Sequence, residues 1–562
     1  MMGLTVIVAV IAIALPPIPT AVALLGADSA RVGAVAIGLW LWKALLLAHM
    51  CLLWVWLRRT PSNRRAGTPV PGQSPSLSSS RDAGPGDGWL TSRRALIGLG
   101  SIMTVGLVLR VIGLGEALWF DEIKMYARYM TQPLGVILAT YDDQNQHILY
   151  SVLARLSIGL FGDSVFALRA PAVLFGVASL GVLYAFGTRV TSRAEALLAT
   201  ALLAASYHHV WFSQNARGYT GLLFWTLLST ALFLDLLRNR DRSRWGLSVA
   251  YAGTVALAVY THPTAAVLPL SHALVAAWAL WRPGRSPEER PSFFPLFAGL
   301  VLAGTFTLQL YAPVLPQVGG VLLEPSLSGV SIEWKNPLWL VSETFGKLAV
   351  GVPGGALVLL PAMAVALYGA WSYFRRSSVD ALAMVLPVVA TATAIIALGH
   401  NLWPRFFFFA AGFGLLIGLR GLFALAPRAG PRGPAIAVGL AVLAIFGSLT
   451  TVPSAWGPKQ DYEAAEAFVD LNAGSSDAVV TVGMTGLPYN EWKARSWTQV
   501  TDATQLADVE ESHERTWLIY SFPTSFQALQ PDVWRRVDSL YREAARYSGT
   551  LGGGDIWVMV RE

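Results

Sequence analysis

Residues 218–244 read GYTGLLFWTLLSTALFLDLLRNRDRSR, an apolar run of about one bilayer thickness that ends in four arginines. A helix of about 20 apolar residues spans the hydrocarbon core of a membrane. Arginines at one end of such a helix mark the cytoplasmic side, because short cytoplasmic loops carry an excess of Lys and Arg. The stretch therefore predicts a transmembrane helix over 218–237, followed by a cytoplasmic loop.

The same kind of run recurs along the chain. Of its 562 residues, 54% are hydrophobic and 13% are charged, a balance that a soluble protein of this size would not show. We expect about thirteen spans, near residues 3–25, 33–57, 94–113, 166–188, 194–212, 218–237, 246–261, 265–282, 295–313, 354–374, 381–399, 405–426 and 434–452. The sequence thus predicts a polytopic α-helical membrane protein with about 13 transmembrane helices.

Basic loops follow every second predicted span. Their arginines are Arg58, Arg59, Arg64, Arg65, Arg189, Arg193, Arg238, Arg240, Arg242, Arg244, Arg282, Arg285, Arg375, Arg376, Arg428 and Arg432. These loops are expected in the cytoplasm, so the loops at 114–165 and 314–353 belong outside. The pattern predicts a multi-pass protein of the plasma (inner) membrane whose functional loops and C-terminal region are extracytoplasmic.

Composition divides the chain into four parts. A two-helix membrane appendage at 1–59 is joined by a disordered cytoplasmic linker at 60–92, rich in Pro, Ser and Gly, to a transmembrane body at 93–457. Residues 458–562 combine a helical pattern with short strand-like runs, at 477–482, 516–521 and 555–560. We therefore expect a small extracytoplasmic α/β domain at the C-terminal end.

Charge and cysteine content exclude several classes of function. The net charge is +7, and the basic excess of the transmembrane part collects in short loops between apolar runs, without the basic stripe that nucleic-acid binding requires. Cys51 is the single cysteine, which removes support for internal disulfides, a cysteine zinc site and thiol catalysis. A transporter should carry its polar groups at the membrane midplane, whereas the distinctive polar residues here gather at outer loop ends.

Two adjacent carboxylates, Asp121 and Glu122, open the first outer loop after Trp119 and Phe120. A carboxylate at the point where an apolar helix reaches the surface is partly desolvated, which raises its proton affinity and suits it to general-base catalysis. The pair is equally typical of residues that cap a helix at its positive N-terminal end. The same loop continues with a polar cluster over 142–147, which includes Asn145 and His147.

Two arginines, Arg217 and Arg405, stand at predicted outer turns beside aromatic residues. An outside arginine is less expected than a cytoplasmic one, and a guanidinium can hold phosphate oxygens through paired, charge-assisted hydrogen bonds. Arg217 alone could equally be a side chain that snorkels to the interface. Together the two arginines suit an anionic lipid headgroup. Lys335 lies on the outer loop at 314–353, where a solvated loop residue is the simpler interpretation.

Four motifs in this order carry a resemblance to a known family. They are WFDE at 119–122, NQHIL at 145–149, FGDSVFALRAP at 161–171 and FSQNARGY at 212–219. The run from Trp119 to about Leu237 resembles the type-C glycosyltransferase superfamily, in particular bacterial lipid-phosphate-sugar transferases akin to protein O-mannosyltransferases and the lipid A aminoarabinose transferase. Many relatives have His-Pro-Pro-Leu where this chain has HILY at 147–150, so a protein acceptor does not follow.

The resemblance implies transfer of a hexosyl or pentosyl unit from a polyprenyl-phosphate donor to a glycan, glycolipid or protein, with inversion. Asp121 would accept the proton of the acceptor hydroxyl, oriented or supported by Glu122 or His147. The donor phosphate would be bound by Arg217, Arg405 and Lys335, and the substrates would be contacted by Trp119, Asn145, His147 and Tyr219.

Two further expectations concern a possible metal ion and the alternative functions. Some relatives use a divalent metal, but the adjacent carboxylates Asp121 and Glu122 are not by themselves an adequate ligand set. A polysaccharide polymerase or ligase that uses diphosphate-linked glycans is the nearest alternative, because it too would act on lipid-linked sugars at the outer face. A membrane transporter is the more distant one.

Overall fold

The computed structural model describes residues 17–26, 31–59, 91–238, 245–281, 293–323 and 332–562, which are mostly helical, as predicted. The linker predicted at 60–92 lies outside the described residues, except for Thr91 and Ser92, which cap and begin helix α4. Most of the predicted span at 3–25 also lies outside them; its last part forms helix α2 (Ile18–Leu25).

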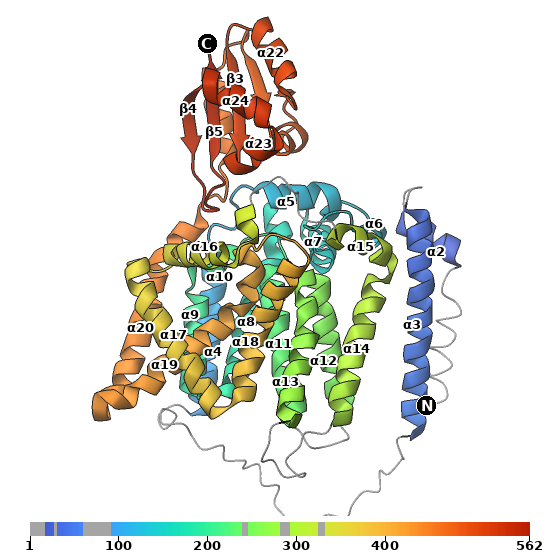
Figure 1. The fold of residues 1–562 in the computed structure, drawn as a ribbon, viewed down its shortest axis with the longest axis vertical. Helices are drawn as coiled ribbons and strands as arrows, with labels where there is room; N and C mark the ends of the chain where they lie inside the picture. Colours follow the sequence, from blue (N-terminus) through green and yellow to red (C-terminus); the bar gives the residue numbers. More distant parts are fainter. Residues whose placement is uncertain (1–16, 27–30, 60–90, 239–244, 282–292, 324–331) are drawn as a thin grey trace, which may run out of the picture.

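Long helices run side by side and form the body of the molecule (Figure 1). In chain order they are α3 (Val32–Arg59), α4 (Ser92–Val111), α8 (Val165–Val190), α9 (Arg193–Ala204), α11 (Tyr219–Arg238), α12 (Trp245–Thr261), α13 (Val267–Trp281), α14 (Phe293–Tyr311), α17 (Ala356–Arg376), α18 (Ser378–Ala397), α19 (Ala411–Leu425) and α20 (Gly433–Thr451). Within the described ranges, nine segments are long and apolar enough to cross a membrane, and one of them, Pro404–Trp456, contains both α19 and α20. The predicted multi-pass helical fold is confirmed.

Shorter elements connect the long helices, and α5, α6, α7, α15 and α16 lie at the end of the bundle next to the C-terminal domain (Figure 1). The elements used below are α5 (Phe120–Met125), the π-helix η2 (Tyr126–Met130), α6 (Leu134–Ala139), α7 (Ile148–Phe161), α10 (Tyr207–Ser213), η3 (Pro263–Ala266), η5 (Ala312–Val314), α15 (Leu315–Leu323), η6 (Ile332–Lys335), α16 (Pro337–Val350), η7 (Pro404–Ala410), η8 (Ala426–Arg432) and η9 (Val452–Trp456). The predicted outer loops therefore contain helical structure of their own.

The span predicted at 194–212 is two helices in the structure. After α9 ends, α10 begins behind Ser206, whose side chain caps it. Arg110 of α4 donates hydrogen bonds to the carbonyls of the last two residues of α9, at 3.3 and 3.5 Å. Carbonyl groups at the end of a helix lack partners within the helix, and Arg110 supplies donors for these two. The break leads the chain into the turn at 214–218, which carries Arg217.

The N-terminal helix α3 stands at the edge of the bundle, next to α14 (Figure 1). Its His49 ring lies 2.7 Å from the Gln309 amide oxygen and 2.9 Å from the Thr305 hydroxyl. At Gly38, helix α3 and η5 are so close that a Cβ atom would lie 1.9 Å from the Ala312 carbonyl oxygen. The lack of a side chain at Gly38 thus allows α3 to dock on η5.

The C-terminal domain is a five-stranded sheet with helices around it (Figure 1). The strands are β1 (Ala478–Thr481), β2 (Thr498–Gln499), β3 (Thr516–Ser521), β4 (Arg542–Tyr547) and β5 (Ile556–Arg561), in the order β2-β1-β3-β5-β4. β1 pairs in parallel with β2 and β3, and β5 pairs antiparallel with β3 and β4. The helices are α21 (Tyr462–Asn472), the π-helix η10 (Leu487–Trp492), α22 (Ala503–Ser512), α23 (Pro523–Leu529) and α24 (Pro531–Leu540). The predicted α/β character is confirmed.

One hydrophobic cluster joins the C-terminal domain to the bundle. Ile123 and Met125 of α5 belong to the same buried cluster as Tyr462 of α21 and Trp517 of β3. The ring of Tyr126 also packs edge-on against Trp492 of η10, with centroids 4.8 Å apart. The domain is therefore packed directly on α5, the helix that carries Asp121 and Glu122.

Candidate active site

Helix α5 brings Asp121 to the end of the bundle. The chain enters it through a turn at Gly113, whose φ of +72° and whose position against Trp456 leave no room for a side chain. Asp121 lies in the first turn of α5, is 6% exposed, and its Oδ2 is 3.4 Å from Nη1 of Arg405. A buried carboxylate beside one guanidinium, rather than enclosed by several donors, still has oxygen atoms able to accept a proton.

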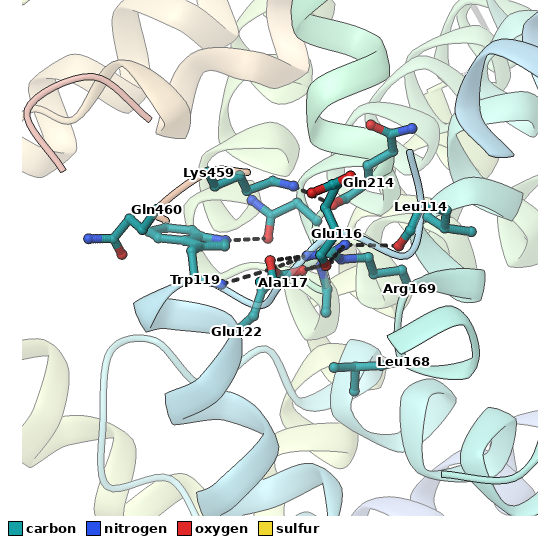
Figure 2. Close-up of polar contacts among 12 residues, drawn as sticks. Leu114, Glu116, Ala117, Trp119, Glu122, Leu168, Arg169, Gln214, Lys459 and Gln460 are labelled. Carbon is teal, nitrogen blue, oxygen red and sulfur yellow. Dashed lines mark hydrogen bonds and ion pairs between the residues drawn. The ribbon is translucent and has the colours of Figure 1, made fainter. Parts of the chain in front are cut away.

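Glu122, the other predicted catalytic carboxylate, is fully buried in a different environment (Figure 2). Its two oxygens accept hydrogen bonds from Arg169 at 2.9 and 2.7 Å, and one of them accepts the Ala216 N–H at 2.6 Å. The carboxylate also reaches back to the N–H of Trp119 at 3.4 Å, as in a helix capping box. For Glu122, the capping interpretation of the sequence matches the structure better than the catalytic one.

The electrostatics of Glu122 agree with a structural role. Burial raises the pKa of this carboxyl, but Arg169, with its charge and hydrogen bonds, the Lys459 charge and the Ala216 N–H together hold the pKa below its usual range. Arg169 in turn donates to the carbonyls of Leu114, Glu116 and Ala117, at 2.9, 2.8 and 3.2 Å. An ionised, fully bonded carboxylate is not available as a proton acceptor.

Arg217 is 1% exposed and has incomplete hydrogen bonding. Its Nη2 donates to Oδ1 of Asn145 at 3.0 Å and lies 3.4 Å from Nε2 of His147. Its Nε and Nη1 are buried and have no hydrogen-bond partner in the described part of the chain. Because a buried, unsatisfied cationic donor costs free energy, these two N–H groups form a candidate anion-binding site.

His147 contributes a further donor to the same place. Its Nδ1 accepts the backbone N–H of Gly218 at 2.9 Å, so the proton of the neutral ring lies on Nε2, next to Arg217. Burial lowers the pKa of His147 well below its usual value, and the charges of Arg217, His262 and Arg405 lower it further. His147 is therefore a neutral N–H donor facing the same space as the guanidinium.

Arg405 connects Asp121 with the group formed by Arg217 and His147. It lies on η7 and its guanidinium packs over the rings of Trp403 and Phe406, at 5.3 and 5.9 Å from their centroids. Nη1 contacts Asp121, while Nε is buried without a partner among the described residues. Phe406 lies against His262, and His262 lies 4.7 Å from His147, centroid to centroid. The structure thus brings Asp121, Arg405, His147 and Arg217 into one site.

Three other predicted residues have different environments. Tyr219 is buried and packs edge-on against His147, with Arg217 5.9 Å above its ring. Trp119 is also buried, and its Nε1 donates to Oδ1 of Asn215, two residues before Arg217. Lys335 ends η6, whose Trp334 ring packs on Trp403.

Sequence reasoning missed His262, Arg169, Lys459 and Gln460. His262 packs against Tyr219 as well as His147, yet a histidine before a proline at a helix end gives no distinctive signal. In the sequence, Arg169 appears only as part of the motif at 161–171. Among the described residues, no group of three or more His, Cys, Asp or Glu side chains could hold a metal ion.

Comparison with known proteins gives a family and a fold. A family model described as dolichyl-phosphate-mannose-protein mannosyltransferase matches residues 145–312, which include Asn145, His147 and Arg217. No curated protein matches the sequence.

Two solved archaeal structures are similar, with 13% identity and a TM-score of 0.50 each. One is the apo oligosaccharyltransferase of Archaeoglobus fulgidus, matched over 82% of this chain and 74% of its own. The other is AglB of the same organism in complex with an inhibitory peptide and a dolichol-phosphate, matched over 84% and 74%. ArnT from Cupriavidus metallidurans bound to undecaprenyl phosphate matches at 13% identity over 83% and 97%, with a TM-score of 0.47.

The archaeal structures share this fold, and the family model covers the segment that carries Arg217 and its neighbours. By this fold and this match, the chain has the membrane fold of type-C glycosyltransferases, and its segment 145–312 is similar to the dolichyl-phosphate-mannose-protein mannosyltransferase family.

Proposed function

We propose that this protein transfers a monosaccharide, a hexose or a pentose, from a polyprenyl-phosphate donor to a hydroxyl group of a glycan, glycolipid or protein. The observation that carries the proposal is Arg217, a buried guanidinium with two N–H groups that have no partner in the described residues. Arg405, which touches Asp121, supplies a third such group. A lipid-linked phosphate ester is an anion that these donors would bind.

The phosphate would lie between Arg217, His147 and Arg405. Arg217 offers Nε and Nη1, His147 offers its Nε2–H, and Arg405 offers Nε. Two guanidiniums stabilise the charge that grows on the phosphate as it leaves, and loss of one such donor costs about 3–4 kcal/mol in other enzymes. Lys335 remains a proposed further contact, because η6 packs next to the segment of Arg405.

Asp121 would act as the general base in a single displacement. The acceptor hydroxyl gives its proton to a carboxylate oxygen of Asp121, and its oxygen attacks the anomeric carbon from the side opposite the phosphate. The bond from that carbon to the phosphate oxygen breaks, and the phosphate leaves with the electron pair. One such in-line attack inverts the anomeric configuration, and Glu122, the carboxylate next to Asp121 in the chain, is bonded to Arg169 and the Ala216 N–H instead of free to act as a nucleophile.

Two further points support the proposal. Basic loops alternate with the predicted spans, which favours a site on the extracytoplasmic side, where polyprenyl-phosphate sugars would be consumed. One of the structures with the same fold was solved with a dolichol-phosphate. Glu122 and Trp119 are assigned to support of the site, because their polar atoms are already bonded to other residues.

The test is transfer of label from a panel of radiolabelled polyprenyl-phosphate monosaccharides to membrane extract by the purified protein. We expect Asp121→Asn to lower turnover by at least about 100-fold, in line with loss of a general base, with unchanged thermal unfolding. Asp163→Asn is the matched control, since Asp163 accepts a hydrogen bond from the Tyr126 hydroxyl, and no hydrogen bond or ion pair joins it to Asp121, Arg217 or Arg405 among the described residues.

Near-normal turnover by Asp121→Asn would remove Asp121 from the base role. Label transfer from diphosphate-linked glycans, with none from any monophosphate donor, would instead identify a polymerase or ligase.

A further inference from the structure

Two consecutive residues, Lys459 and Gln460, lie where the chain passes from the bundle into the C-terminal domain (Figure 2). They follow η9 and precede α21, and both are almost fully buried. A lysine is seldom buried without a carboxylate partner. Their contacts lead to the two segments that carry Asp121 and Arg217.

Lys459 holds the Arg217 segment. Its Nζ donates to the carbonyl oxygen of Gln214 at 2.6 Å and lies over the ring of Trp211, 5.2 Å from the centroid. Gln214 follows the last residue of α10, where backbone carbonyls lack helical partners and attract positive charge. The lysine thus fixes the end of α10, three residues before Arg217.

Gln460 holds the Asp121 segment. Its Oε1 accepts the backbone N–H of Phe120 at 3.0 Å, and its Nε2 donates to the Gly554 carbonyl at 2.9 Å. The Phe120 N–H is one of the groups at the start of α5 that the helix itself leaves free. Gln460 therefore joins the first turn of α5 to the C-terminal domain, one residue before Asp121.

We propose that Lys459 and Gln460 are positioning residues that set the placement of Asp121 relative to Arg217. On this view, which rests on the proposed function, the C-terminal domain takes part in catalysis through its first residues. Transfer requires the acceptor oxygen at Asp121 and the leaving phosphate at Arg217 to lie on opposite sides of one carbon atom. A misplacement of about 1 Å can cost about 100-fold in rate, so contacts to both segments are able to control turnover.

The protonation state of Lys459 provides an independent test of the positioning role. Burial and the Arg169 guanidinium lower the pKa of Lys459 to about 7, against the opposing charges of Glu122 and Glu116. As the pH rises through about 7, the ammonium becomes an amine and its hydrogen bond to Gln214 loses charge assistance. We therefore expect kcat to fall as the pH rises through this range.

The experiment compares Lys459→Met, Lys459→Arg and Gln460→Leu with wild type, in full-length protein. Lys459→Met keeps an apolar stem over Trp211 but has no N–H to donate, so kcat should fall about 10- to 100-fold, with the donor KM changed less than threefold. Lys459→Arg should recover most of the rate and lack the decrease in kcat above pH 7. Lys347→Met is the control, because the Lys347 side chain also donates to the C-terminal domain, at the Leu551 carbonyl, while its contact with His208 of α10 is made by the backbone carbonyl and is kept in the variant.

Hydrogen exchange separates this inference from the proposed function. Amide exchange at Phe120 should rise in Gln460→Leu, and exchange at Ala216 should rise in Lys459→Met. If wild type transfers sugar while both variants keep its kcat per folded molecule, the positioning role is wrong even though the function holds. If wild type transfers no sugar from any donor, the function fails. Unchanged exchange at both amides would then overturn the positioning role as well.

Discussion

Arg217 has more unused hydrogen-bonding capacity than a buried side chain normally keeps. Two of its nitrogen atoms lack partners in the described residues, while the third is placed by Asn145. A planar guanidinium can bind two oxygens of one phosphate at once, which an ammonium cannot do. The residue is therefore expected to be intolerant even of a change that keeps its charge.

For Arg217→Lys we expect the donor kcat/KM to fall at least about tenfold, and for Arg217→Gln at least about 100-fold, consistent with loss of one strong transition-state donor. Initial rates measured over a range of donor concentrations give these values. Arg155→Gln is a suitable control, since Arg155 donates to the Gln132 carbonyl instead of facing the site. Equal effects of the lysine and glutamine variants would show that the paired geometry is unimportant.

At the level of single residues, the sequence predicts part of the site. Asp121, Arg217 and Arg405 stand out because each is a charged residue where an apolar helix ends at a predicted outer turn. His262 could not be predicted, because it is brought to His147 only by the packing of α12 against its neighbours. Glu122 was assigned with Asp121, yet adjacent residues on a helix point in different directions, and only Glu122 meets Arg169.

At the scale of elements, the turn that leads into α5 depends on Arg169 of α8. This guanidinium binds both oxygens of Glu122 and three carbonyls of the turn, so one side chain organises the approach to Asp121. Removal of one partner from a buried ion pair leaves a charge with no compensation. Substitution of Arg169 should therefore act first on the stability of the fold and only secondarily on turnover.

We expect Arg169→Met to destabilise the protein by about 3–5 kcal/mol, measured by thermal unfolding in detergent. The double variant Arg169→Met with Glu122→Gln should recover part of this loss, because the carboxylate that lost its arginine partner is no longer charged. If the loss of stability in the double variant exceeded the sum of the losses in the two single variants, the two residues would not act as a pair.

The pH dependence of this pair follows from the depressed pKa of Glu122, which lies below its usual value of 4.5. Such a carboxyl stabilises the fold fully above its unfolded pKa and loses that contribution as the pH falls through its folded pKa. The stability difference between wild type and Glu122→Gln should therefore be constant above about pH 5. It should shrink at lower pH.

Element boundaries show where sequence patterns are insufficient. The apolar run at 194–212 has the length of one span, and the break between α9 and α10 depends on Arg110, which comes from a separate helix. In the C-terminal domain, β1, β3 and β5 are apolar and were predictable. β2 has two exposed residues and β4 is a largely exposed edge strand, so neither carries the hydrophobic pattern of a buried strand.

At the scale of the whole molecule, the C-terminal domain and the bundle share buried side chains. Ile123 and Met125 lie in one hydrophobic cluster with Tyr462 and Trp517. A chain cut after Gly457 would leave these faces uncovered, and exposed apolar patches promote association. We expect such a truncated protein to aggregate during size-exclusion chromatography in detergent, while full-length protein elutes as a single species. A monodisperse truncated protein with wild-type turnover would show that the domain is dispensable.

The hydrogen bond between Phe120 and Gln460 joins residues 340 positions apart in the chain. A ribosome adding about 5–20 residues per second needs roughly 20–70 s to cover that distance. During this time α5 has already left the ribosome, but the residue that caps its first N–H does not yet exist. The contact that we propose to position Asp121 can therefore form only after all the helices of the bundle between Phe120 and Gln460 have been synthesised.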